Sequence, residues 1–167
     1  MRPAEEKFYF YYFLVHIPIT TFIDASVVLP GNLQFSKDLV AWHIKNNNDF
    51  LLYEKPLWLK AFVLVELLFQ LPGFFWFVIK FKEVWRLRNH DSKETKALLK
   101  STENTLTKWL HVYGWNASAT TFICLITVWL RGYYPFGDFL PMPHKAKFKL
   151  ISLYIPYLLI PLRLLFV

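Results

Sequence analysis

Four apolar runs alternate with polar segments along the chain, and each run is long enough to cross a bilayer as an α-helix. A membrane helix needs about 20 apolar residues, because each residue adds about 1.5 Å to its length. The pattern therefore predicts an all-α membrane protein, a single domain over residues 1–167 that forms a bundle of four transmembrane helices. The predicted helices cover residues 8–29, 57–81, 107–130 and 148–167.

The polar segments between these runs differ in composition. Residues 31–56 mix polar and apolar side chains around Asn46-Asn47-Asn48, a turn signal, so we expect short interfacial helices there. Residues Lys82–Thr105 form the most charged segment, and we expect a solvated connection with a helical turn or two. Binding of anionic lipid or of a partner protein is the alternative for this segment.

Composition favours a membrane protein over a soluble one. The 167 residues are 55% hydrophobic and 20% aromatic, which is too apolar for a soluble domain of this size. The net charge is +7, but the basic residues collect between the apolar runs rather than along one face. This distribution excludes nucleic acid as the expected partner and indicates anionic membrane lipids.

Neither metal nor redox chemistry is indicated by the sequence. Cys124 is the single cysteine, so an intrachain disulfide is impossible. The sequence has no paired histidines at metal-ligand spacing, no glycine-rich phosphate loop and no nucleophile elbow. We therefore expect no cofactor, no metal and no conventional catalytic residue.

Topology follows from the first run and from the basic residues. The first run could be a signal peptide, but it exceeds the usual apolar core and contains Asp24, so we expect it to remain as a helix. Basic residues in the N-terminal lead and in Lys82–Thr105 slightly outnumber those in the other loops. Both termini are therefore expected in the cytosol.

Two acids lie inside apolar runs, where an ionised carboxylate is costly. Glu66 is near the middle of the second run and Asp24 near the end of the first. If the two meet in an apolar pocket, double ionisation is disfavoured, so one carboxyl stays protonated and donates a hydrogen bond to the other. We expect Glu66 to hold the proton and Asp24 to be the anion that receives a cationic amine. The alternative is a hydrogen bond that only joins two helices.

Further polar side chains fall on the same helical faces. His16 and Thr20 precede Asp24 at intervals of four residues and share its stripe. Gln70 lies four residues after the acid of the second run, and Pro72 should bend that helix one turn beyond them. These positions predict one polar cluster inside the bundle.

The third predicted helix contributes Asn116 and Thr120, which also share a face. Asn116-Ala117-Ser118 matches a glycosylation sequon. We discount it, because a sequon inside a membrane helix does not reach the glycosylation machinery.

Several motifs resemble the sigma-2 receptor (transmembrane protein 97) family, which belongs to the EXPERA superfamily together with the emopamil-binding sterol isomerase. They are His16-Ile17-Pro18-Ile19-Thr20, Phe22-Ile23-Asp24, Val28-Leu29-Pro30, Glu66-Leu67-x-Phe69-Gln70-Leu71-Pro72 and the run from Tyr154 to Pro161. The charged segment after Phe81 is longer than in the animal receptor, which leaves a fungal-type member as one interpretation.

The resemblance implies an endoplasmic reticulum protein of the EXPERA fold, in some cases a homodimer, with a buried pocket for sterols or cationic amphiphilic molecules. It implies a role in sterol or lipid homeostasis or, for fungal-type members, in the handling of mitochondrial precursor proteins. By motif, the ligand-binding positions are Asp24, Glu66, Gln70, Thr120, Leu153 and Tyr157. The supporting positions are His16, Thr20, Asp49, Asn116 and Tyr154.

Two other functions stay open. An enzyme of the sterol isomerase type would use the two acids as proton donor and acceptor. The isomerase relatives carry a histidine four residues before the first acid, where this chain has Thr20, so the proton relay is incomplete and we expect no catalysis. The second alternative is a structural or interaction protein whose carboxyl pair binds no ligand.

Overall fold

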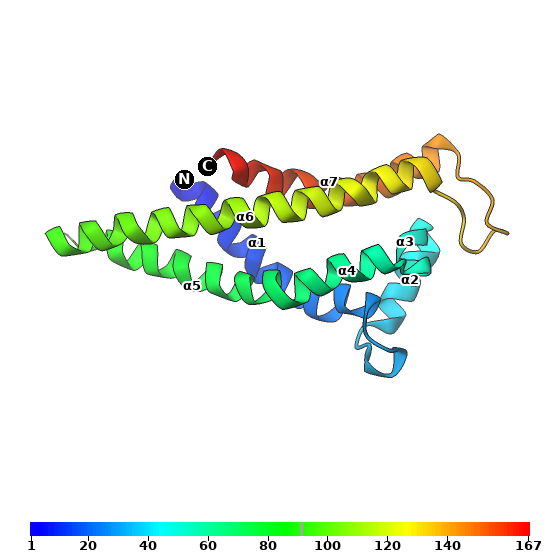
Figure 1. Ribbon diagram of the computed structural model, residues 1–167, viewed down its shortest axis with the longest axis horizontal. Helices are drawn as coiled ribbons and strands as arrows, with labels where there is room; N and C mark the ends of the chain where they lie inside the picture. Colours follow the sequence, from blue (N-terminus) through cyan, green and yellow to red (C-terminus); the bar gives the residue numbers. More distant parts are fainter. Residues whose placement is uncertain (91) are drawn as a thin grey trace.

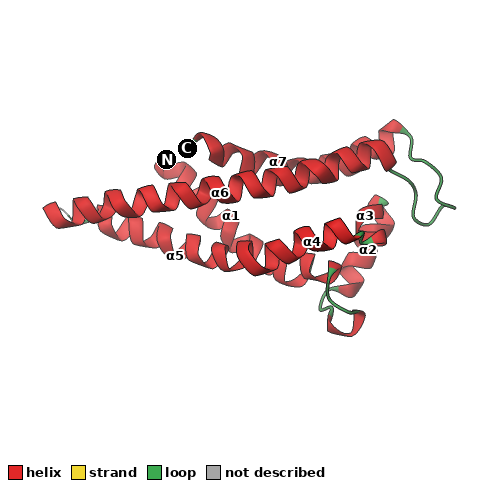
Figure 2. Ribbon diagram, viewed as in Figure 1, coloured by secondary structure: helices red, strands yellow, loops and turns green. Residues whose placement is uncertain are grey.

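The computed structural model describes residues 1–90 and 92–167, and these are almost entirely helical (Figure 2). The prediction of an all-α fold is confirmed. The described α-helices are α1 (Pro3–Phe22), α2 (Lys37–Asn47), α3 (Phe50–Glu54), α4 (Leu57–Val65), α5 (Leu71–Arg88), α6 (Lys93–Arg131) and α7 (His144–Arg163). Short 3-10 helices η1 (Asp24–Val27), η2 (Gly31–Leu33) and η4 (Leu164–Phe166) and a π-helical turn, η3 (Glu66–Gln70), complete the described helices.

Three helical stretches of the described chain are long and apolar enough to cross a membrane. They are Pro3–Val27, Leu57–Arg88 and His144–Phe166. Helix α6 has 39 residues, about 60 Å at the helical rise and twice the thickness of a bilayer core. It is less apolar than the other three, so its crossing of the membrane stays a prediction.

The first predicted helix differs from the observed one at both ends. Helix α1 begins at Pro3, a residue well suited to a first helical position, and has two acids in its first turn. It ends at Phe22, so Asp24 begins the 3-10 turn η1 instead of continuing the α-helix. Gln34 Nε2 and Lys55 Nζ donate to the carbonyl oxygen of Ser26 at 3.0 and 2.7 Å. These side chains from later segments hold η1 in place.

The prediction of a solvated connection over Lys82–Thr105 is wrong. Helix α5 continues to Arg88 and α6 already starts at Lys93, so most of this segment is helical. The Ser92 side chain accepts the backbone N–H of Thr95 at 3.1 Å, which caps the start of α6.

Burial explains why the charged segment folds. Val84, Leu87 and Leu106 are buried although their neighbours in sequence are charged. Glu6 of α1 is 4% exposed, and it accepts two hydrogen bonds from Arg88, at 2.6 and 2.8 Å. The apolar contacts and this ion pair extend the bundle beyond the apolar runs.

The second predicted helix is interrupted at its polar residues. The Leu71 N–H bonds to the carbonyl oxygen of Glu66, five residues earlier, so the chain makes a π-helical turn. Pro72 follows directly; it has no N–H, and its ring would collide with the carbonyl of an uninterrupted α-helix. The irregularity expected one turn beyond Gln70 therefore falls on the turn that carries Glu66 and Gln70.

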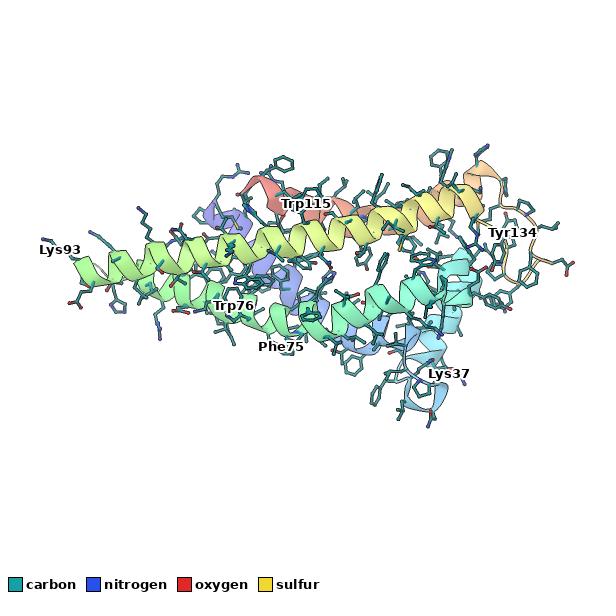
Figure 3. All side chains as sticks on the ribbon, viewed as in Figure 1. Lys37, Phe75, Trp76, Lys93, Trp115 and Tyr134 are labelled. Atoms are coloured by element: carbon teal, nitrogen blue, oxygen red, sulfur yellow. The ribbon has the colours of Figure 1, made fainter. Side chains whose placement is uncertain are left out.

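Helices α6 and α7 run side by side, and both termini lie at one end of the bundle (Figure 1). The short helices α2 and α3 and the loop between α6 and α7 lie at the other end. Phe75 and Trp115 point away from the bundle and are exposed (Figure 3). Exposed aromatic side chains of this kind suit contact with lipid.

Two buried clusters fill the bundle, one toward each end. In the first, Phe13 of α1 stacks on Phe74 and Phe77 of α5, with ring centroids 5.5 and 4.6 Å apart. The second gathers Phe50 and Leu51 of α3 against Val128 of α6. Side chains from both clusters line a cavity of about 350 Å³.

Candidate functional site

The cavity draws its walls from α1, η1, α2, α3, α4, η3, α6 and α7. Most of the side chains that line it are apolar or aromatic, with a small number of carboxyl, amide and hydroxyl groups among them. A volume of about 350 Å³ lies within the range of about 300–1,000 Å³ that is usual for small-molecule sites. The cavity is therefore the candidate functional site.

Asp24 and Glu66 lie beside each other on the cavity wall. The hydroxyl of Thr20, which is completely buried, donates to Glu66 Oε1 at 2.7 Å. The carboxyl of Asp24 is a close neighbour of both Glu66 and Thr20. The end of α1 and the π-helical turn thus bring together two acids that are 42 residues apart in the sequence.

Gln70 and Thr120 also line the cavity. Gln70 Nε2 donates to Asn116 Oδ1 at 2.7 Å, which joins the π-helical turn to α6. Asn116 is not among the lining residues and contacts the cavity wall through this bond to Gln70. The Thr120 hydroxyl bonds back to the carbonyl oxygen of Asn116 at 3.0 Å, within its own helix.

Helix α7 contributes Leu153 and Tyr157 to the wall, and α1 contributes His16. The rings of His16 and Tyr157 are 5.8 Å apart and nearly perpendicular. All six positions that the sequence assigned to ligand binding therefore line one cavity.

Asp49 and Tyr154 form a second polar group on the cavity wall, toward α2 and α3. Asp49 is 1% exposed and accepts hydrogen bonds from the Tyr154 hydroxyl at 2.8 Å, from the Leu52 N–H at 3.2 Å and from His43 Nε2 at 3.3 Å. This carboxyl caps α3 and ties it to α7 and α2.

Lys55 secures the segment that carries Asp24. Its Nζ donates to the carbonyl oxygen of Ser26 in η1. Partial burial, with a smaller effect of the Lys60 charge, lowers the pKa of the Lys55 ammonium below its ordinary value. The ammonium is therefore held close to the protein rather than fully in water.

Sequence reasoning missed several polar residues of the wall, among them Tyr12, Tyr113, His43 and Thr121. Tyr12 of α1 precedes His16 by four residues, so the stripe of His16, Thr20 and Asp24 already pointed to it. Tyr113 of α6 and His43 of α2 also line the cavity. Nothing in the sequence pattern distinguished these two from other aromatic and polar residues.

A match to a protein-family profile shows which family the chain belongs to. Residues 35–167 match the profile described as EXPERA, the expanded EBP superfamily. The chain belongs to the EXPERA family. Its apolar helices and this membership make it a membrane protein.

Curated EXPERA relatives align with nearly the whole chain. The efficient mitochondria targeting-associated protein 19 of Saccharomyces cerevisiae is 48% identical, over 98% of this chain and 96% of that protein. The sigma intracellular receptor 2 of Homo sapiens is 34% identical, over 92% of this chain and 81% of the receptor. The resemblance to the sigma-2 receptor family is confirmed, and the yeast similarity fits a fungal-type EXPERA member.

Proposed function

We propose that this EXPERA protein binds an apolar ligand with a cationic amine inside the membrane, through Asp24 and Glu66. One observation carries the proposal: the two carboxyl groups lie together on the wall of a largely apolar cavity. A buried cation needs a counter-charge, because its desolvation is not otherwise offset. The relatives that are receptors by name support a ligand-binding role.

The hydrogen bonds around the acids suit one shared proton. Two ionised carboxylates only accept, so a bond between them requires a proton on one of them. Glu66 Oε1 accepts the Thr20 hydroxyl, and in our proposal Oε2 of the same carboxyl holds the shared proton and donates a hydrogen bond to Asp24. The pair then carries a single negative charge on Asp24, and one ammonium group neutralises it.

Neutral sterols are the second ligand class that we propose for the same cavity, since its aromatic and aliphatic walls suit a rigid apolar body. We place the protein in the endoplasmic reticulum membrane, with both termini cytosolic, and propose that it can form a homodimer. Its role would lie in sterol or lipid homeostasis or, as the name of the yeast relative suggests, in efficient mitochondria targeting.

Binding to the purified protein tests this proposal. A labelled tertiary-amine amphiphile should bind the wild-type protein, and Asp24→Asn should weaken it by about 100-fold or more, since an unpaired buried charge costs several kcal/mol. A neutral sterol should bind both proteins with similar affinity. Asp38→Asn, on the exposed face of α2, is the matched control.

Equal loss of amine and sterol binding in Asp24→Asn would mean that Asp24 mainly holds the fold. Absence of binding of either ligand to the wild-type protein would favour a structural or interaction role instead.

A sterol isomerase is the second candidate, because adjacent carboxyl groups could donate and accept a proton. Thr20 opposes it: its hydroxyl donates to Glu66 and is no base at neutral pH. We expect the purified protein to leave a Δ8 sterol unchanged, and formation of the Δ7 isomer would establish the enzyme instead.

A further inference from the structure

His16, on the part of the cavity wall that α1 forms, has a hydrogen-bond acceptor to which no described residue donates. His16 is 9% exposed and lines the cavity. Its Nδ1 lies 3.1 Å from the carbonyl oxygen of Tyr12, and since a carbonyl only accepts, Nδ1 carries the proton. In the neutral ring Nε2 is then an acceptor, and no group of residues 1–90 and 92–167 donates to it.

Two tyrosines leave a donor unused at the same place. The hydroxyl oxygens of Tyr12 and Tyr113 are 2.9 Å apart, and both residues line the cavity. Their mutual bond uses one of the two hydroxyl hydrogens. The other hydrogen has no acceptor within the described part of the chain. The ring of Tyr12 lies only 4.1 Å from that of His16, between centroids, so the spare donor and the spare acceptor are neighbours.

A donor and an acceptor side by side match one chemical group best. A hydroxyl both donates and accepts, so it satisfies both protein atoms at once. A cation would meet only the single acceptor here: Glu66, which accepts the Thr20 hydroxyl one turn beyond His16, is the proposed protonated partner of the pair, and the proposed anion, Asp24, lies farther along the chain. His16 precedes Asp24 by eight residues, which is about 12 Å along a helix.

We propose that His16, Tyr12 and Tyr113 form a hydroxyl-binding subsite, so that the ligand is a long apolar alcohol such as a 3-hydroxysterol, with its hydroxyl at this subsite. This inference rests on the proposed ligand-binding function and names the ligand class and its orientation. The rigid ring system of a sterol then extends from His16 toward Asp24. The acids meet whatever group the far end of the ligand carries.

Competition between two sterols tests the subsite. Labelled cholesterol bound to the purified protein is displaced by unlabelled cholesterol or by cholest-5-ene, which lacks only the 3-hydroxyl. We expect cholesterol to compete at least about tenfold better with the wild-type protein, as two hydrogen bonds in an apolar site predict. The ratio of the two competing affinities, cholesterol over cholest-5-ene, should fall toward one in Tyr113→Phe and in His16→Phe.

The matched control is Tyr11→Phe, because Tyr11 is the exposed neighbour of Tyr12 on the outer face of α1; it should keep the wild-type ratio. Tyr12→Phe replaces Tyr113→Phe if the buried Tyr113 proves necessary for folding. A wild-type ratio near one, or a ratio unchanged in the variants, overturns the subsite.

Binding of a tertiary-amine amphiphile that has no hydroxyl group separates the two proposals. It should be within about threefold of wild type in Tyr113→Phe and His16→Phe, since fewer than 1 kcal/mol separates such affinities. If the amine binds through Asp24 while the sterol ratio stays at one, the proposed function stands and the subsite fails. If the sterol ratio behaves as expected while the amine does not bind, the subsite stands and the role of Asp24 as counter-charge fails.

Discussion

A single glycine sets the distance between the two helices that run side by side. A Cβ atom at Gly114 of α6 would lie 2.7 Å from the carbonyl oxygen of Pro161 in α7 and 3.2 Å from Leu164 Cβ. The first contact is with backbone, which cannot rotate away as a side chain would. The close approach of α6 and α7 beside the cavity therefore depends on the missing side chain.

We expect Gly114→Ala to destabilise the protein by about 1–3 kcal/mol, the usual cost of overpacking. Thermal unfolding in detergent measures it. The matched control is Gly73→Ala in α5, where the new Cβ would meet only Phe77, at 3.7 Å. Because alanine favours a helix over glycine by about 1 kcal/mol, this control should be neutral or stabilising. Equal destabilisation by both changes would show that the approach of Pro161 is unimportant.

At the scale of residues, the sequence predicted those site positions that share a helical face. His16 and Thr20, or Glu66 and Gln70, were predicted together because positions four apart lie on one side of a helix, whereas Leu153 and Tyr157 were predicted from the family resemblance. The contact of Tyr12 with Tyr113 and that of His43 with Asp49 depend on how separate elements pack. No local periodicity records such packing, so these partners could not be predicted.

At the scale of elements, an ion-pair network joins α1 to the end of α5 and to the early turns of α6. Glu6 of α1 accepts both Arg88 and the indole N–H of Trp85, at 3.0 Å, from α5. Arg88 also pairs with Glu103 of α6. The sequence showed a run of mixed charge, which usually indicates solvent, because it could not show that Glu6 would be buried against that run.

Removal of the buried Glu6 charge should destabilise the end of the bundle where α1, α5 and α6 meet. We expect Glu6→Gln to lower the free energy of unfolding by about 1–3 kcal/mol, less than for a fully buried pair because Arg88 is partly exposed. Hydrogen exchange should rise in residues 93–106. Glu5→Gln is the control, since its ion pairs with Arg2 and Arg163 are exposed on the arginine side and should matter less.

A Glu6→Gln protein with wild-type stability and wild-type hydrogen exchange would contradict the claim that the Glu6–Arg88 pair stabilises these helices. The combined change Glu6→Gln with Arg88→Met should recover part of the loss, because it removes the arginine that has lost its buried partner.

At the scale of the whole molecule, the ends of the bundle carry different segments. Lys93, at the start of α6, and the loop around Tyr134 lie at opposite ends (Figure 3). The apolar runs were sufficient to predict helices, since a chain segment in lipid must pair its backbone N–H and C=O groups with each other, and an α-helix does so. The crossing of α6 stays a prediction, because the charged residues between Lys93 and Lys108 lower its overall apolar character.

Cysteine labelling tests the orientation. Cys124 is the single natural cysteine and is buried, so the background should be low. We expect Lys93→Cys to react with an impermeant maleimide added from the cytosolic side. Phe136→Cys, exposed in the loop after α6, should react only after the membrane is opened. The reverse pattern would place both termini in the lumen.

The central claim is that Asp24 and Glu66 present one buried negative charge to a cationic ligand. The most direct measurement is the affinity of a tertiary-amine amphiphile and of its neutral carbon isostere, each for the wild-type protein and for Asp24→Asn. The wild-type protein should prefer the amine by about 100-fold, or roughly 3 kcal/mol, and Asp24→Asn should abolish that preference while it still binds the isostere. A preference for the amine that persists in Asp24→Asn, or a wild-type protein that binds both molecules equally, would contradict the account.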